Sequence, residues 1–314
     1  MADLPQDRVD SAPPFTYCGV DCFGPFLVRE GRKELKRYGV IFTCLSSRAI
    51  HLEIANSLDT DSFINALRRF LALRGPIRQL RSDRGTNFMS AERELREAVS
   101  EMDDQQISNF LLKEGCDFFK FKPNVPSASH MGGVWERQIR TVRNVLTRLL
   151  QQLGNQLDDE SLRTVICEVT AIVNSRPLSV ENLNDPLSDP PLTPNHLLTM
   201  KSKVLLPPPG NFVKPDLYVR RRWRRVQFIA NEFWNRWRKE YLSNLQSRSK
   251  WISQSRNMKV GDIVMIRDDN LPRNRWKLGQ VTVAEADDDG LVRKVSLRTS
   301  SSSLDEKGKV VCSV

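Results

Sequence analysis

Apolar and polar positions change their spacing several times along the first third of the chain. The runs 15–26, 37–48 and 49–58 are rich in Val, Ile, Phe, Leu and Cys, and Gly, Pro or short polar breaks separate them. Such runs predict three β-strands, the first ending at a Gly-Pro turn and the other two forming a hairpin-like meander. Residues 59–75 instead carry apolar positions three and four apart, between an Asp-Thr start and Gly75, which predicts a helix.

Strands and helices continue to alternate up to about residue 175. We expect a short strand in 76–88, polar helical stretches near 91–101 and 104–113, a strand at 116–123, and helices at 132–153 and 159–175. Three strands followed by helix, strand, helices, strand and helices favour a mixed sheet flanked by helices, and therefore the α/β fold class.

A change in composition ends this core. Nine of the seventeen prolines lie between residues 177 and 215, which predicts a partly extended linker. A long helical pattern then runs from 217 to 251, and strand-like runs with Gly, Asp and Pro turns predict a small β-barrel of about five strands. The predicted organisation is a disordered tail at 1–14, the core at 15–180, the linker at 181–215, the basic helix and barrel at 216–300, and a tail at 301–314.

The net charge of +10 is confined to one part of the chain. Residues 214–277 contain seventeen Lys and Arg and six Asp and Glu, an excess of eleven, so the rest of the chain carries 10 − 11 = −1. A local basic excess indicates a polyanionic partner for that segment, most simply nucleic acid.

Several classes of protein are disfavoured. No apolar run approaches the roughly eighteen residues of a membrane-spanning helix, and the N-terminal segment has no apolar signal core. The six cysteines include no CxxC pair, which favours free thiols of an intracellular protein, and three histidines do not make up a zinc finger.

Three acidic residues stand at positions where they can meet. Asp21 sits at the end of the first strand, Asp83 closes the fourth, and Glu136 begins the helix after the fifth. Taken singly, each has a simpler interpretation, as a strand-end cap, a turn residue or part of a solvated helix face. If the first and fourth strands are neighbours, both aspartates emerge at the same end of the sheet and the helix can cross above them. Three carboxylates there would bind two Mg²⁺ ions, since this ion prefers oxygen ligands.

These residues also carry a family resemblance. YCGVDCFGPF, SDRGTNF and PSASHMGGVWERQIR, with Asp21, Asp83 and Glu136, resemble the D,D,E core of retroviral and retrotransposon integrases, most closely the BEL/Pao class of long-terminal-repeat retrotransposons. NSRPL at 174–178 also fits that class. The segment from FWNRWRKEYL through KLGQV resembles the domain of unassigned function that follows the core in these polyproteins. Together the resemblance covers about residues 15–298.

The resemblance implies a fold and a chemistry. The fold is ribonuclease-H-like, with an SH3-like barrel after the core, and the chemistry is DNA integration, a DNA recombination in which two Mg²⁺ or Mn²⁺ ions serve phosphoryl transfer to target DNA. Asp21, Asp83 and Glu136 would be both the catalytic residues and the metal ligands. The spacing between Asp83 and Glu136 is longer than in retroviral integrases, which we interpret as a surface insertion near 90–115. The family's zinc-binding domain ahead of the core is missing from this sequence, which we interpret as a fragment or a derived host gene.

Basic residues near the carboxylates and in the second half are the candidate nucleic-acid contacts. They are His130, Arg140, Arg143, Arg220, Arg221, Arg222, Arg224, Arg225, Arg273, Arg275 and Lys277. A solvated helix start explains the cluster at 220–225 almost as simply. We expect double-stranded DNA as the partner, self-association into a homo-oligomer, no membrane, and at least transient nuclear localisation. The alternatives are a catalytically idle or domesticated remnant that binds DNA or chromatin, and a ribonuclease-H-type nuclease.

Overall fold

The computed structural model divides the chain into two compact units. It describes residues 9–82, 120–123, 135–153, 156–178, 191–201, 208, 210–245, 256–268, 271–304 and 310–313. Unit 1 comprises residues 1–174 and 209–237, and unit 2 comprises residues 175–208 and 238–314. The long helix therefore contributes its first part to unit 1, although its sequence pattern groups it with the C-terminal segment. The domain boundaries drawn from the sequence stay a prediction.

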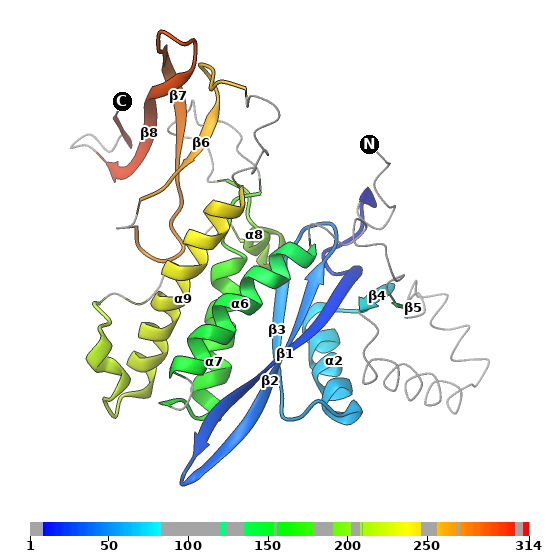
Figure 1. Cartoon of the computed structure of the whole chain (residues 1–314). Helices are drawn as coiled ribbons and strands as arrows, with labels where there is room; N and C mark the ends of the chain where they lie inside the picture. The colour runs from blue at the N-terminus through cyan, green and yellow to red at the C-terminus, as the bar shows by residue number, and fades with distance from the viewer. Residues whose placement is uncertain are drawn as a thin grey trace. The chain divides into compact units, whose positions relative to one another are not determined.

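Unit 1 is built on a five-stranded mixed sheet (Figure 1). Its strands are β1 (Tyr17–Glu30), β2 (Lys33–Cys44), β3 (Ile50–Ala55), β4 (Gln79–Ser82) and β5 (Lys120–Pro123), in the order β3-β2-β1-β4-β5. β1, β2 and β3 pair in antiparallel fashion, whereas β4 lies parallel to β1 and β5 parallel to β4. The predicted meander is therefore confirmed, and the first and fourth strands are neighbours, as the proposed carboxylate site requires.

The first strand is longer than its sequence suggests. The Gly-Pro pair was expected to end it, but β1 continues through the cis Gly24–Pro25 bond to Glu30. The pairing with β2 shifts register between Phe23 and Phe26 and then resumes. Gly24 has φ +121°, a backbone conformation that glycine adopts readily, so the pair forms a bulge within the strand and not a turn.

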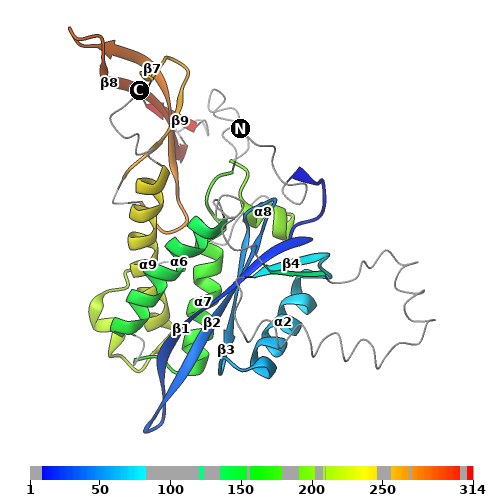
Figure 2. The same cartoon turned by 45° about the vertical axis from the view of Figure 1, so that its right-hand side comes forward.

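In the part of unit 1 that the structure describes, three helices cover this sheet. α2 (Thr60–Arg74) lies on one face, and α6 (Trp135–Leu153) and α7 (Asp159–Val173) lie on the other in both views (Figures 1 and 2). The α2 prediction is confirmed at both ends: the side chain of Asp59 accepts a hydrogen bond from the Ser62 backbone, and Gly75 follows the last turn. The mixed sheet flanked by helices confirms the predicted α/β fold class. The helical stretches predicted at 91–101 and 104–113 lie outside the described residues.

The NSRPL segment begins with a residue that joins α7 to the sheet edge. Asn174 caps the C-terminal end of α7, and its side chain is buried. Its carboxamide accepts a hydrogen bond from the Ile50 backbone N–H and donates one to the Ile50 carbonyl, both at 2.8 Å. Because β3 is the edge strand, the asparagine side chain takes the place of a further strand at Ile50.

A half-buried polar network joins β3 to α2. Nε2 of His51 lies 3.0 Å from a carboxylate oxygen of Glu53, and Arg69 donates to the other oxygen at 2.7 Å. Arg74 donates to Nδ1 of His51 at 3.3 Å, which assigns the proton of the ring to Nε2, where it is donated to Glu53. Burial alone would raise the pKa of Glu53, but the hydrogen bonds from His51 and Arg69 outweigh it and lower that pKa.

Unit 2 contains a four-stranded antiparallel sheet in the order β6-β7-β8-β9. The strands are β6 (Ile263–Ile266), β7 (Lys277–Ala286), β8 (Val292–Leu304) and β9 (Val310–Ser313). The short helix α8 (Pro194–Thr199) belongs to the same unit. The β-rich nature of this segment is confirmed, with four strands among the described residues where about five were predicted. Closure into an SH3-like barrel stays a prediction.

The long helix α9 (Arg222–Leu245) follows the short 3₁₀ helix η2 (Lys214–Leu217) and belongs to both units. The apolar positions predicted at three- and four-residue spacing, Phe233 and Trp237 among them, form a buried face, and Trp234 is buried as well. These tryptophans are core residues and not stacking platforms for bases. Among the described residues, no helix combines the length and apolar character needed to cross a membrane.

Candidate active site

Asp21 is the fifth of the fourteen residues of β1 and not at the end of the strand as predicted, because β1 continues past the Gly24–Pro25 bulge. It directly follows the residues of β1 that pair with the parallel strand β4. Its neighbour Val20 is opposite Ser82 in the parallel register, and Asp21 itself is opposite Ile41 of β2. Asp83 follows Ser82 directly in the sequence but lies outside the described residues. The side chain of Asp21 is 22% exposed, so its carboxylate lies at the surface of the sheet and not within the core.

Arg143 of α6 reaches this carboxylate. Its guanidinium donates a hydrogen bond to Asp21 Oδ2 at 3.0 Å, and its side chain is 44% exposed. The helix is held in this position because Val142, Leu146 and Leu149 are fully buried and α6 packs on β1. Arg143, next to Val142, therefore lies at the border of the buried face, where a long side chain extends over the sheet. The structure thus brings together a predicted catalytic residue and a predicted nucleic-acid contact.

Of the other residues predicted for this site, positions 136 and 140 lie on α6, and residue 130 is outside the described residues. Position 136 is the second residue of α6, and its side chain is outside the described residues, as is the whole of His130. Seven residues separate positions 136 and 143, which is two helical turns, or about 10 Å along the axis on nearly the same stripe. Arg140 lies between them and is exposed.

A groove of about 380 Å³ opens beside Arg143. Its lining residues come from the bulge of β1 and from the following two turns of α6: Cys22, Phe23, Gly24, Arg143, Asn144, Thr147 and Arg148. Burial, and secondarily the neighbouring Asp21, raises the pKa of Cys22 to about 12. The thiol is therefore protonated at neutral pH and is a poor metal ligand or nucleophile.

The described residues hold part of the predicted metal site. Among them, no group of three His, Cys, Asp or Glu side chains lies close enough to hold a metal ion. Of the three predicted ligands only the side chain of Asp21 is described, so the predicted triad stays a prediction. Cys18, Cys22, Cys44 and Cys167 are free thiols.

The basic cluster at 220–225 has two kinds of arginine. Arg224 and Arg225 are bound within the protein: Arg224 pairs with Asp216 at 2.7 Å, and Arg225 donates to the backbone carbonyls of Leu217, Val219 and Gln156. Because these interactions hold the start of α9, both residues have a structural role that the sequence did not reveal.

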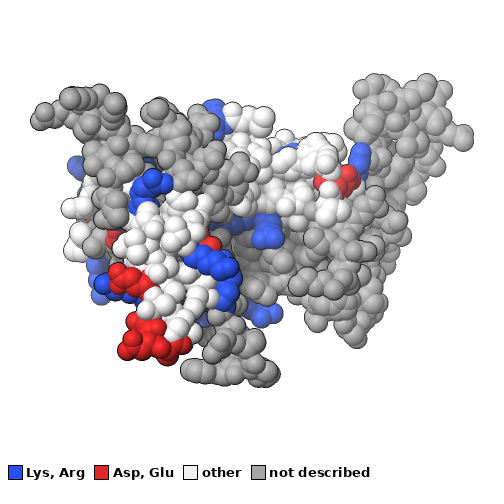
Figure 3. Space-filling view, turned by 90° about the horizontal axis from the view of Figure 1, so that it is seen from above, with Lys and Arg blue, Asp and Glu red and all other residues white. Residues whose placement is uncertain are grey.

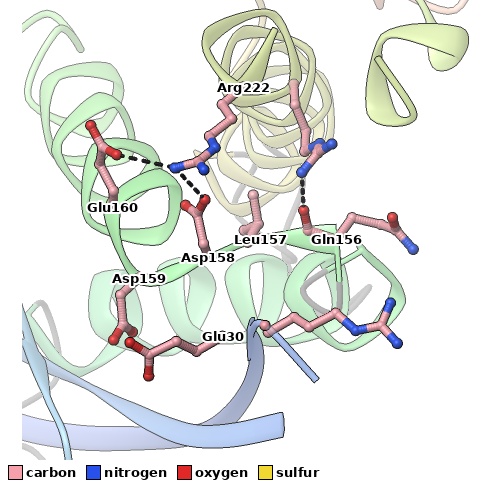
Figure 4. A pocket seen from close by; sticks show the side chains of 10 residues that line it. Glu30, Gln156, Leu157, Asp158, Asp159, Glu160 and Arg222 are labelled. Carbon is pink, nitrogen blue, oxygen red and sulfur yellow. Dashed lines mark hydrogen bonds and ion pairs between the residues drawn. The ribbon is translucent and has the colours of Figure 1, made fainter. Parts of the chain in front are cut away.

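Arg222 also has acidic partners. Its guanidinium lies 3.0 Å from Asp158 and 3.4 Å from Glu160, which ties α9 to the start of α7 (Figure 4). Arg222 and its two acidic partners border a cavity of about 570 Å³ that Arg29, Glu30 and Arg225 also line. Arg220 and Arg221, by contrast, are exposed and form no ion pair with the described residues.

The basic residues predicted to bind nucleic acid in unit 2 also differ in exposure and in their acidic partners. Arg273 is 3% exposed, so its guanidinium is inside the unit and a direct contact with a phosphate would require it to move. Arg275 is exposed, and Lys277 lies 4.0 Å from Asp268. On the face drawn in Figure 3, Lys and Arg side chains occur in several separate places and the Asp and Glu side chains gather mainly in one area.

Comparisons with known proteins give limited matches. The family DUF5641, a family of unknown function, matches residues 221–314, the segment predicted to resemble a domain of unassigned function. No curated protein matches the chain. Solved structures with weak similarity include the catalytic core domain of HTLV-2 integrase in complex with magnesium, at 17% identity and a TM-score of 0.32, covering 55% of this chain and 92% of that one.

Two further solved structures are similar at the same level. The BIV integrase catalytic core has 14% identity and a TM-score of 0.35, covering 59% of this chain and 95% of that one. The simian T-cell lymphotropic virus intasome with the PP2A regulatory subunit B56 gamma has 10% identity and a TM-score of 0.36, covering 99% and 81%. At TM-scores below 0.5, these similarities assign neither chemistry nor partners to this chain, and the assignment to the BEL/Pao class stays a prediction.

Proposed function

We propose that the chain is a metal-dependent polynucleotidyl transferase of the integrase type, which joins DNA ends to target DNA. The observation that supports it is the contact between Arg143 and Asp21 on β1, beside the parallel strand β4. A helix that carries Glu136 two turns earlier on the same stripe runs over the strand that carries the first aspartate. This arrangement favours a site for phosphodiester chemistry over three unrelated surface carboxylates.

The proposed ligands suit hard divalent ions. Asp21, Asp83 and Glu136 offer only carboxylate oxygens, the donor type that Mg²⁺ and Mn²⁺ prefer. Two such ions, when bound, would supply activation of an attacking hydroxyl and charge stabilisation of a leaving oxygen. No nucleophilic side chain is required.

The cations of α6 would bind and orient the DNA backbone. Arg143 pairs with Asp21 in the protein alone and is exposed enough to exchange that carboxylate for a phosphate. Arg140, one turn earlier, is exposed and points the same charge toward solvent. His130 and the exposed arginines of the basic cluster would add contacts, with homo-oligomers as the assembly and the nucleus as the place of action. These parts of the proposal follow from the resemblance and the charge distribution.

A strand-transfer assay tests the chemistry. The full chain is incubated with labelled double-stranded terminal-repeat ends and a plasmid target, in Mg²⁺ or Mn²⁺ and in EDTA. The variants are Asp21→Asn, Asp83→Asn and Glu136→Gln, and Asp61→Asn, at an exposed position of α2, removes the same charge elsewhere. We expect metal-dependent joining by the wild type and by the control, and a loss of at least about 10³-fold in each site variant, as expected for groups that act as a unit.

Each other outcome identifies a rival function. Salt-sensitive DNA binding without joining, equal in the wild type and the variants, would refute the transferase and favour the idle DNA-binding remnant. Cleavage of the RNA strand of a hybrid, with no joining of DNA ends, would favour a ribonuclease-H-type nuclease. Joining that survives any of the three substitutions would remove that residue from the site.

A further inference from the structure

The segment before α9 holds one arginine in a fixed place. Asp216 of η2 accepts a hydrogen bond from the Val213 backbone at 2.8 Å, which anchors its carboxylate. Arg224 then donates to both carboxylate oxygens, at 2.7 and 3.3 Å, and to the Asn211 carbonyl at 3.0 Å. A bidentate pair with a third hydrogen bond fixes the plane of the guanidinium.

This fixed guanidinium braces an exposed aromatic side chain. The Cζ atom of Arg224 lies 5.2 Å from the ring centre of Phe212 and 5.6 Å from that of Trp223. Phe212 meets Trp223 edge to face, with ring centres 5.7 Å apart and an angle of 80°. Trp223 nevertheless remains 50% exposed. The indole is thus held in one orientation by two neighbours while half of its surface is open to solvent.

Positive residues flank Trp223 in the sequence. Lys214, Arg220 and Arg221 are exposed and form no ion pair with the described residues. The single nearby carboxylate in this stretch, that of Asp216, is already neutralised by Arg224. Tyr218, a second aromatic residue in the stretch, is 70% exposed. Exposed aromatic side chains interleaved with free cations are the composition of surfaces that bind single-stranded nucleic acid.

We propose that Trp223, Tyr218, Arg220 and Arg221 form a binding surface for single-stranded nucleic acid, in which a base stacks on Trp223 and the arginines hold the flanking phosphates. The choice of DNA as the polymer rests on the proposed function. An acidic peptide would satisfy the arginines but has no flat ring for the open indole surface. A duplex would offer phosphates, but its bases are already stacked on one another.

The proposal is tested by fluorescence anisotropy of the full chain with labelled oligothymidylate of about 15 nucleotides, within the site sizes of single-strand-binding modules. The comparison ligands are an abasic strand with the same number of phosphates, a duplex of equal length, and polyglutamate as a competitor. Trp223→Ala is expected to weaken binding of oligothymidylate about fivefold or more and to leave the abasic strand and the duplex unchanged. Trp223→Phe should retain most of the affinity, because it keeps an aromatic face.

The cluster supplies its own matched control for charge. Arg221→Gln and Arg222→Gln each remove one positive charge from neighbouring positions, but Arg222 is already paired with Asp158 and Glu160. Arg221→Gln should weaken binding to every strand and lower the slope of log affinity against log salt by about 1, whereas Arg222→Gln should change that slope by much less.

Three results would overturn the proposal. They are an unchanged affinity of Trp223→Ala for oligothymidylate, an equal loss on the abasic strand, and competition by polyglutamate as strong per charge as by the abasic strand. All measurements are made in EDTA, where joining does not occur. A failure here therefore leaves the proposed chemistry standing, and a failure of the strand-transfer assay leaves this surface standing.

Discussion

The clamp between α7 and the edge of the sheet gives the sharpest prediction of stability. Asn174 is 1% exposed and makes two hydrogen bonds of 2.8 Å to the Ile50 backbone. In Asn174→Ala both groups of Ile50 lose their partner in a place that water does not reach. An unsatisfied buried polar group costs about 1–3 kcal/mol, so for two such groups we expect a loss of about 2–6 kcal/mol in the free energy of unfolding of unit 1.

Urea unfolding followed by circular dichroism measures this loss. With an m-value of about 2 kcal/mol per molar urea, a loss of 3 kcal/mol lowers the midpoint by about 1.5 M. Asn235→Ala is the matched control, since Asn235 is exposed on α9 and the same atoms are removed there. We expect the control to stay within about 0.5 kcal/mol of the wild type. Equal midpoints for the two variants would show that water replaces the clamp and that the reasoning is wrong.

Asn174→Asp separates the two hydrogen bonds by pH. A carboxylate at this position still accepts a hydrogen bond from the Ile50 N–H, but its second oxygen faces the Ile50 carbonyl oxygen and repels it. A protonated carboxyl group can instead donate a hydrogen bond to that carbonyl. Burial and this repulsion raise the folded-state pKa of the introduced group above its unfolded value of about 3.9. The free energy of unfolding of Asn174→Asp is therefore highest below a pH of about 3.9, and it falls as the pH rises through the folded-state pKa of the introduced carboxyl group. A pH-independent difference from wild type would contradict this.

Two further predictions concern the sheet. The folded-state pKa of Glu53 is lowered, so this carboxylate contributes stability that is present above its unfolded-state pKa of about 4.3 and is lost as the pH falls through its folded-state pKa. In Glu53→Gln we therefore expect the part of the acid-induced decline in unfolding free energy that Glu53 causes to disappear. Parallel pH profiles of the urea midpoints of wild type and variant would refute this. Gly39→Ala should cost about 1–3 kcal/mol, because a Cβ there would lie 2.5 Å from the Phe23 ring. Phe23→Leu in the same chain should restore part of the loss in thermal denaturation, and an unchanged melting temperature of Gly39→Ala would refute the clash.

Local signals explain which elements could be predicted. The ends of α2 were predictable because Asp59 and Gly75 act within one turn of the helix they bound. The end of β1 was not, because a Gly-Pro pair is read locally as a turn, and only the pairing with β2 on both sides of Gly24 shows a bulge. Asn174 attracted notice as part of a motif, but its function depends on Ile50, 124 positions earlier.

The internal partners of the basic cluster were hidden from the sequence for the same reason, and its role as a nucleic-acid contact stays a prediction. Five arginines in six positions look equivalent in sequence, and their separation into bound and free ones depends on distant partners. Arg225 binds the Gln156 carbonyl, and Arg222 binds Asp158 and Glu160, more than sixty positions away. Counting charge therefore overestimates the cations available to a phosphate. A buried position such as that of Arg273 adds to the overestimate.

The contact of Arg143 with Asp21 yields a final prediction about the order of events at the candidate site. In the protein alone the guanidinium occupies the carboxylate that the proposed chemistry needs, at 3.0 Å and with both side chains partly exposed. An ion pair of this exposure is worth about 0.2–1 kcal/mol, so in Arg143→Gln the carboxylate should bind Mn²⁺ up to about fivefold more tightly, measured by calorimetry without DNA. Arg163→Gln, at an exposed position of α7, removes an equal charge and should leave the affinity unchanged.

The same Arg143→Gln variant should join DNA less well, because the side chain that leaves Asp21 is the one proposed to hold a phosphate. Tighter metal binding together with weaker joining distinguishes this exchange from a purely structural pair, in which both would fall. An unaltered Mn²⁺ affinity would show that the pair does not compete with the ion.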